Sequence, residues 1–248
     1  MPIVRILLIL LALASPALAQ DGARDAAAAS EAAQAFQIYV EGVTKQGGRP
    51  DLTRPEVAAT LGHVFDLGAL NALPPAQASD LPWLNDWLEA ANATNELILY
   101  YGAKPGPQPD VAAIRRNMTE YEDQYAAATN FLIRFQAREA VSTKMFVAGL
   151  APEQRTRVAE EAFAVARRSC AETILAAISA VILAGGKPAN ARLVAAAIRD
   201  TREVWASYFL PRDRARVIEL LADPAKRAPD ETAQTDVAAF TTALQVVN

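Results

Sequence analysis

The chain has 248 residues, of which 24 are basic and 28 acidic, and it contains one histidine and one cysteine. Its formal net charge of −4 argues against nucleic-acid binding, because phosphate recognition needs concentrated Lys and Arg side chains. The single histidine excludes multi-histidine zinc sites and HExxH metalloproteases, and the single cysteine excludes an intramolecular disulfide.

Residues 1–19 have the pattern of a secretory signal peptide. Arg5 precedes an apolar run over residues 6–14, and small residues at Ala17 and Ala19 come directly before Gln20. The apolar run is shorter than the ~20 residues of a membrane-spanning helix, so a retained membrane anchor is the less favoured alternative. We therefore predict cleavage after Ala19 and a mature chain, without a membrane span, in the periplasm or outside the cell.

The mature chain would be a single all-helical domain over residues 20–248. Without residues 1–19, 23 basic and 28 acidic residues remain, which leaves a formal charge of −5. Within this domain we expect N-terminal helices and a linker over 20–78 and the main bundle over 79–248. An exported domain of this size without disulfides, together with the Ala-rich composition, favours a bacterial periplasm.

In the first part of the mature chain, apolar residues recur at steps of three and four, which is typical of amphipathic helices. The sequence Thr53-Arg54-Pro55-Glu56 fits a capping box, which would start a short helix. The stretch before Ser79 or Asp80, with Pro74-Pro75, predicts a connection with at most one helical turn. The predicted helices cover 26–44, 55–65 and 80–102, and the connection covers 66–79.

The longest pattern follows Asp110 and ends at Gly149. Its apolar positions are Val111, Ile114, Met118, Tyr121, Tyr125, Ala128, Leu132 and Phe135. This spacing predicts one uninterrupted helix over 110–149 whose seam packs against other helices. A second long helix is predicted over 152–184, antiparallel to the first, and its uncharged second half predicts burial on every side.

Further helices are predicted over 188–208, 211–221 and 231–247. No segment alternates with period two over a useful length, so we predict no sheet. The predicted fold class is an all-α bundle of about seven to nine helices, with the long helices at its centre.

A weak internal repeat accompanies this pattern. Gly102-Ala103-Lys104-Pro105 is echoed 83 positions later by Gly185-Gly186-Lys187-Pro188. This echo suggests a duplicated helical hairpin over residues 84–125 and 167–209. The alternative is chance, because Ala-rich helices joined by Gly and Pro produce such matches.

No set of residues is predicted to be catalytic, cofactor-binding or metal-ligating. His63 has Asp66 one turn away, but no nucleophile motif accompanies it, so a histidine at a helix end or in the core is the favoured interpretation. Cys170 enters an apolar run, which predicts a buried and inert thiol.

Carboxylates cluster at two places on the predicted long helices. These acids flank the apolar seam, which favours a solvated face over acid-base chemistry or a cation site. They are Glu120, Glu122 and Asp123, and Glu160 and Glu161. Their neighbours Tyr121 and Tyr125 fall in the seam and are predicted to be core residues.

Two interpretations of function follow. The favoured one is an exported scaffold or adaptor of the cell envelope that binds a protein partner or a small apolar ligand, with no cofactor. The alternative is an exported enzyme whose site combines carboxylates, tyrosines and arginines from several helices. A cavity where two or more acids converge with displaced pKa values would favour the enzyme. The sequence leaves the oligomeric state open.

Overall fold

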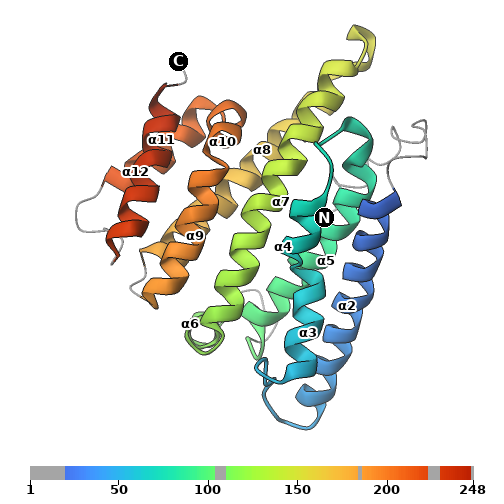
Figure 1. The fold of residues 1–248 in the computed structure, drawn as a ribbon, viewed down its shortest axis with the longest axis vertical. Coiled ribbons are helices and arrows are strands. Elements are labelled where there is room, and N and C mark those ends of the chain that lie inside the picture. The colour runs from blue at the N-terminus through green and yellow to red at the C-terminus, as the bar shows by residue number, and fades with distance from the viewer. Residues whose placement is uncertain (1–19, 104–109, 184–185, 223–229, 247–248) are drawn as a thin grey trace. The chain divides into compact units, whose positions relative to one another are not determined.

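The computed structural model describes residues 20–103, 110–183, 186–222 and 230–246, and these residues form helices and no strand (Figure 1). The predicted all-α fold class is therefore confirmed. Ala17 and Ala19, at the predicted cleavage site, lie outside the described residues, whereas Gln20 is the first described residue and belongs to α2 (Gln20–Lys45). Within the described ranges, no helix is both long enough and apolar enough to cross a membrane.

The chain divides into two compact units, which we describe separately. The N-terminal unit comprises Asp21–Leu73 and Trp83–Leu132, and the C-terminal unit contains Pro74–Pro82 and Ile133–Asn248. This division differs from the expected one between residues 78 and 79, because the chain from Trp83 onward packs with α2.

In the N-terminal unit, α2 and α5 run in the same direction. The helices of this unit are α2, α3 (Pro55–Val64), α4 (Leu67–Ala72), most of α5 (Leu81–Tyr100), α6 (Val111–Glu120) and the first part of α7 (Glu122–Gly149). Gly22 lies against Trp83, and further along the two helices Phe36 and Ile98 share a core cluster. A Cβ atom at Gly22 would lie only 2.7 Å from the Trp83 ring, so this close approach requires glycine.

The core of the N-terminal unit follows the predicted apolar stripes. Its main cluster contains Phe36, Val40, Leu52, Val57, Leu61, Ile98 and Tyr121. A second group is aromatic: the Phe131 ring lies 5.6 Å from Trp87 and 5.8 Å from Phe65, between ring centroids. The indole of Trp87 also donates a hydrogen bond to the Val64 carbonyl at 2.8 Å, which ties α5 to the end of α3.

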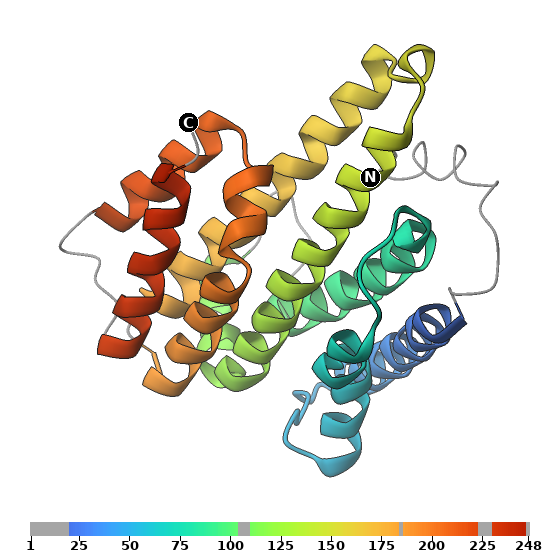
Figure 2. The same cartoon turned by 45° about the horizontal axis from the view of Figure 1, so that its top comes forward.

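In the C-terminal unit, the second part of α7 and α8 form an antiparallel hairpin, and α9 and α12 lie side by side (Figures 1 and 2). The helices that complete this unit are α8 (Arg157–Ala177), α9 (Pro188–Asp200), α10 (Arg202–Tyr208), α11 (Pro211–Ala222) and α12 (Glu231–Val246), with 3₁₀ turns at Ala78–Asp80 and Pro152–Gln154. Its completely buried large side chains include Phe135, Ile174, Ile178, Trp205 and Phe240.

The predicted uninterrupted helix over 110–149 is wrong at one residue. Tyr121, with φ −108° and ψ 29°, separates α6 from α7. Its side chain enters the core, and its hydroxyl donates a hydrogen bond to the Pro50 carbonyl at 2.9 Å. The seam periodicity continues across the break because only one residue leaves the helical conformation, so spacing alone could not reveal it.

Two later helices also differ from their predictions. The helix expected over 152–184 begins at Arg157 and changes at Ile178–Ile182 into a π-helical turn. Its second half is not buried on every side, because Ala176 and Ser179 are exposed. The helix expected over 188–208 breaks at Thr201, between α9 and α10.

The helix starts were predicted with mixed success. Asp110 caps α6 by accepting hydrogen bonds from the backbone of Ala112 and Ala113, as a start signal should. The capping box at Thr53 is wrong, because its hydroxyl donates to Asp51 at 2.6 Å and α3 begins after Arg54 without a side-chain cap.

The predicted duplication remains a prediction. The segments 84–125 and 167–209 each contain a helix, a connection, a shorter helix and a one-residue break, but α6 has 10 residues and α9 has 13.

Candidate functional site

The structure does not bring His63, Asp66 and Cys170 together at a common site. His63 is exposed near the end of α3, and Asp66 caps α4 by accepting a hydrogen bond from the Ala69 amide at 2.8 Å. Asp66 is therefore used by the backbone of the next helix. Cys170 is 6% exposed, which confirms the predicted buried thiol.

The predicted acidic clusters stay at helix surfaces. Glu120 forms an ion pair with Arg49 at 2.5 Å, and Glu161 pairs with Arg157 at 2.8 Å. The neighbouring Tyr121 and Tyr125 are buried, as predicted. Within the described part of the chain, no group of three or more His, Cys, Asp or Glu side chains is arranged to hold a metal ion.

The N-terminal unit contains a polar network centred on Asn117, which is completely buried. The Asn117 amide group donates hydrogen bonds to the carbonyls of Leu99 at 2.8 Å and Tyr101 at 2.7 Å, at the end of α5. Its carbonyl oxygen accepts a hydrogen bond from Arg49 at 3.1 Å. A single side chain therefore fastens the end of α5 and the loop before α3 to α6.

Aromatic rings complete this network. The guanidinium group of Arg49 lies 5.7 Å from the centre of the Tyr101 ring and 5.9 Å from that of Tyr121, which are cation–π distances. Burial, followed by the nearby Glu120 carboxylate, raises the pKa of Tyr121. The phenol therefore stays neutral, and the network serves to hold the loop in place.

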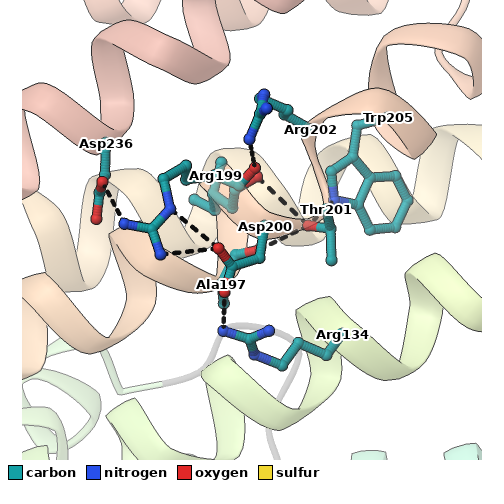
Figure 3. A network of polar contacts seen from close by, with 9 residues as sticks. Arg134, Ala197, Arg199, Asp200, Thr201, Arg202, Trp205 and Asp236 are labelled. Atoms are coloured by element: carbon teal, nitrogen blue, oxygen red, sulfur yellow. Dashed lines mark hydrogen bonds and ion pairs between the residues drawn. The ribbon is translucent and has the colours of Figure 1, made fainter. Parts of the chain in front are cut away.

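The C-terminal unit contains a network of charged side chains (Figure 3). Arg134 of α7 contacts Asp200 at 2.7 Å, and Arg199 contacts Asp200 at 2.8 Å and Asp236 of α12 at 2.8 Å. Partial burial alone would raise the pKa of Asp200, but the hydrogen bonds from both arginines hold this pKa below its usual value. Because each carboxylate has an arginine partner, the network joins α7, α9 and α12.

A second ion pair anchors the short segment of the C-terminal unit that precedes α5. Arg138 of α7 contacts Asp80 at 2.9 Å, and both side chains are largely buried. Asp80 also accepts a hydrogen bond from the Gln77 amide at 3.0 Å. The Asp80 carboxylate is therefore also occupied by structural contacts.

Glu139 is the one described carboxyl whose pKa is strongly raised, to about 7, and burial is the cause. Burial, followed by the Glu139 carboxylate, also raises the pKa of the Cys170 thiol. Tyr208 of α10 belongs to the same cluster, with its pKa raised first by burial and then by Cys170 and Glu139. Arg167 covers the Tyr208 ring at 5.7 Å from its centre.

This Glu139 cluster could accept and release a proton near neutral pH. A single carboxyl beside a buried thiol and a buried phenol offers no second acid, and both partners hold their protons more tightly than usual. Neither the Cys170 thiol nor the Tyr208 phenol is therefore activated as a nucleophile.

A groove with a volume of about 420 Å³ lies between α2 and α5 in the N-terminal unit. Its walls consist mainly of small side chains. They include Ala27, Ser30 and Ala33 from α2 and Ala90, Ala93 and Thr94 from α5. Thr94 is completely buried and its hydroxyl bonds to the Ala90 carbonyl, so the floor of the groove is closed.

The chemistry of this α2–α5 groove is acidic. Asp86 and Glu89 line it, and its lining includes no Lys, Arg or His. Both acids are exposed, and within the described ranges neither takes part in a hydrogen bond or ion pair. The groove can therefore offer two negative charges beside an apolar surface.

Comparison of the chain with protein-family models, with curated proteins and with solved structures found no match.

Sequence reasoning missed Asn117, Glu139 and the groove. Asn117 did carry a signal, since Ala113, Asn117 and Tyr121 are spaced at i+4 and the two flanking residues are buried. Glu139 gave no signal, because its burial depends on α8 and α10, which are distant in the sequence. The groove likewise depends on the pairing of α2 with α5.

Proposed function

We propose that this chain is an exported helical protein of the periplasm, and that it works as a non-catalytic scaffold or adaptor of the cell envelope. The signal-peptide pattern over residues 1–19 supports export.

The observation that carries the binding function is the use of carboxylates within the two units. Asp80, Asp200 and Asp236 each accept contacts from arginines that connect different segments of the C-terminal unit. Glu120 does the same for the loop at Arg49 in the N-terminal unit. These acids stabilise the bundle, and none of them lines the α2–α5 groove.

The alternative of an exported enzyme has one observation in its favour. Glu139, Tyr208 and Arg167 have the residue types expected for a carboxylate, tyrosine and arginine site, and the pKa of Glu139 is about 7. Against it, Tyr208 is only 5% exposed and the cluster has a single carboxyl. Binding is therefore the function that the described residues support better.

Export can be tested by expressing the full chain in a bacterium and fractionating the cells. We expect a periplasmic protein whose intact mass corresponds to a chain that begins at Gln20. The variant Ala19→Arg should stay unprocessed, because a large cation does not fit the small-residue cleavage pattern. A wild-type protein that keeps residues 1–19 and remains in the cytoplasm would overturn the proposal.

Binding can be tested by crosslinking in the intact envelope, followed by mass spectrometry. We expect one protein to be recovered reproducibly with the wild-type chain. Purified protein should also be tested for hydrolysis of ester, phosphate and glycoside substrates, with Glu139→Gln as the matched variant. Turnover that Glu139→Gln abolishes would favour the enzyme instead.

A further inference from the structure

The α2–α5 groove has the length and surface expected of a seat for a third helix. Its lining extends over residues 23–37 of α2 and 83–97 of α5, which corresponds to about 21 Å of each helix at ~1.5 Å per residue. Both helices contribute lining residues along this whole length, so the groove is continuous. Small side chains on both walls allow another helix to approach closely.

The groove's apolar surface is distributed as a helical partner would need. On α2, Ala23, Ala27, Ser30 and Ala33 recur at steps of four and three along one face. On α5, Ala90, Ala93 and Leu97 do the same. An amphipathic helix binds such a groove through an apolar stripe at positions i, i+3, i+4 and i+7.

The charges at the groove decide which helix fits. Asp86 and Glu89 lie three residues apart on α5, and no cation of the groove's lining balances them. A second copy of this chain that docked through the same groove would be a poor occupant, since it would place the same two acids against them. A partner with Lys or Arg beside its apolar stripe would instead give both carboxylates opposite charges.

We propose that the α2–α5 groove binds a partner protein through an amphipathic helix that has an apolar stripe of small or medium side chains and is flanked by Lys or Arg. This inference rests on the proposed binding function and names the surface and the kind of partner. The apolar stripe supplies buried area, and Asp86 and Glu89 set the orientation of the partner helix and its rate of association.

A direct test uses the mature chain and two synthetic peptides of identical composition. One peptide carries an Ala/Leu stripe at helical spacing flanked by lysines, and the other has the same residues scrambled so that no stripe forms. Binding is measured by fluorescence anisotropy of the labelled peptides. We expect the striped peptide to bind at least roughly ten-fold more tightly than the scrambled one. Equal binding would show charge attraction alone and would overturn the proposal.

Two variants locate the binding to the groove. Asp86→Lys together with Glu89→Lys should weaken the striped peptide by roughly ten-fold or more, because opposite charges become like charges. Ala27→Trp should also weaken it, and at high salt as well, because the exposed Ala27 lines the groove and a larger side chain fills it. Circular dichroism of each variant confirms that the helices are retained.

The matched control is Glu172→Lys together with Glu219→Lys. These acids are exposed on α8 and α11 of the C-terminal unit, so the net charge changes equally while the groove is untouched. We expect the control to keep its affinity within about two-fold, since surface charges at a distance are screened by salt. An equal loss in both double variants would contradict a site in the groove.

Photo-crosslinking in the envelope separates failure of this inference from failure of the proposed function. A photoreactive residue at Ala93 in the groove should capture a partner through a helical segment that contains Lys or Arg, whereas one at Ala176 on α8 should not. Capture only at Ala176, unchanged by the charge reversal at Asp86 and Glu89, would overturn the groove and leave the scaffold function standing. A wild-type chain that is neither exported nor crosslinked at any position would overturn the function itself.

Discussion

The two units satisfy their buried polar groups in different ways. In the N-terminal unit, the neutral side chains of Trp87, Asn117 and Tyr121 donate hydrogen bonds to backbone carbonyls at helix ends and in a loop. In the C-terminal unit, arginines connect helices through the carboxylates of Asp200 and Asp236. The first unit therefore relies mainly on neutral donors, beside the one ion pair of Arg49 with Glu120, and the second relies mainly on charged pairs.

This difference predicts that the stability of the C-terminal unit depends more strongly on pH than that of the N-terminal unit. Amide, indole and phenol donors keep their protons over the range in which carboxylates titrate. In the C-terminal unit, the pKa of Asp200 is lowered, so its contribution is present above its unfolded pKa and is lost as the pH falls. The pKa of Glu139 is raised, so its contribution is lost as the pH rises through about 7. We expect the C-terminal unit to be most stable between these limits.

The largest effect is expected for Asn117→Ala in the N-terminal unit. The change leaves the carbonyls of Leu99 and Tyr101 without their partner inside the protein, which should lower the free energy of unfolding by about 3 kcal/mol. Urea unfolding measures the loss, and it should be the same at mildly acidic and mildly basic pH. Asn92→Ala, at an exposed position of α5, is the control and should have little effect. A loss of stability that changed with pH would contradict the expectation that the N-terminal unit depends on neutral hydrogen-bond donors.

The next largest effect is expected for Glu139→Gln in the C-terminal unit, where it tests the pH dependence directly. Glu139→Gln should leave stability near pH 5 almost unchanged and raise it by about 2 kcal/mol at pH 8, where the wild-type carboxyl must ionise in a buried setting. The measurement is urea unfolding as a function of pH. Glu172→Gln, an exposed acid on the neighbouring helix, should show no such change. If wild type and Glu139→Gln had parallel pH profiles, Glu139 would not be the group that titrates.

The same titration should be visible at Cys170, the only thiol in the chain. As the pH rises through about 7, ionisation of Glu139 should favour local opening of the structure around it. A thiol reagent should then label Cys170 faster than expected from the increase in the thiolate fraction alone. Glu139→Gln should remove this additional acceleration. Equal labelling rates of both proteins at every pH would show that ionisation of Glu139 does not control access to Cys170.

A smaller effect is expected for Asp236→Ala. It removes the contact with Arg199 at 2.8 Å, and since Arg199 is partly exposed the loss should be about 1 kcal/mol and should shrink with added salt. Hydrogen exchange should increase first in α12 and α9. The exposed pair of Arg157 and Glu161 provides the control, and Glu161→Ala should cost less than Asp236→Ala. The opposite order would argue that the Figure 3 network does not join these helices.

The smallest effect, expected for Gly42→Ala, belongs to a comparison that tests the close packing of α2 on α5. Gly42→Ala should stabilise α2 by about 0.5 kcal/mol, because its added methyl group meets open space and alanine favours helix. Gly22→Ala should instead destabilise the protein by about 1 kcal/mol, because the methyl group would lie 2.7 Å from the Trp83 ring. Thermal unfolding compares the two variants. A stabilised Gly22→Ala variant would mean that the ends of α2 and α5 are not in close contact.

Much of the fold could be predicted because helical periodicity is a local property. The helices α11 and α12 begin at their predicted positions, and Asp110 caps α6 as expected. The breaks at Tyr121 and Thr201 could not be predicted, since a one-residue departure keeps the apolar spacing in register. The capping box at Thr53 failed because the N-cap position of α3 is Arg54, while the Thr53 amide and hydroxyl both donate hydrogen bonds to Asp51.

The candidate sites were decided by contacts between distant parts of the chain. The sequence by itself determined the helical class, the apolar faces and the burial of Tyr121, Tyr125 and Cys170, because each follows from residue type and spacing. Only the tertiary structure decided that Asn117 binds the end of α5, that Glu139 is desolvated beside Cys170, and that α2 and α5 form a groove. Hydrogen bonding and desolvation depend on which side chains meet in space, and a helical repeat specifies the face that is buried but not the partner that covers it.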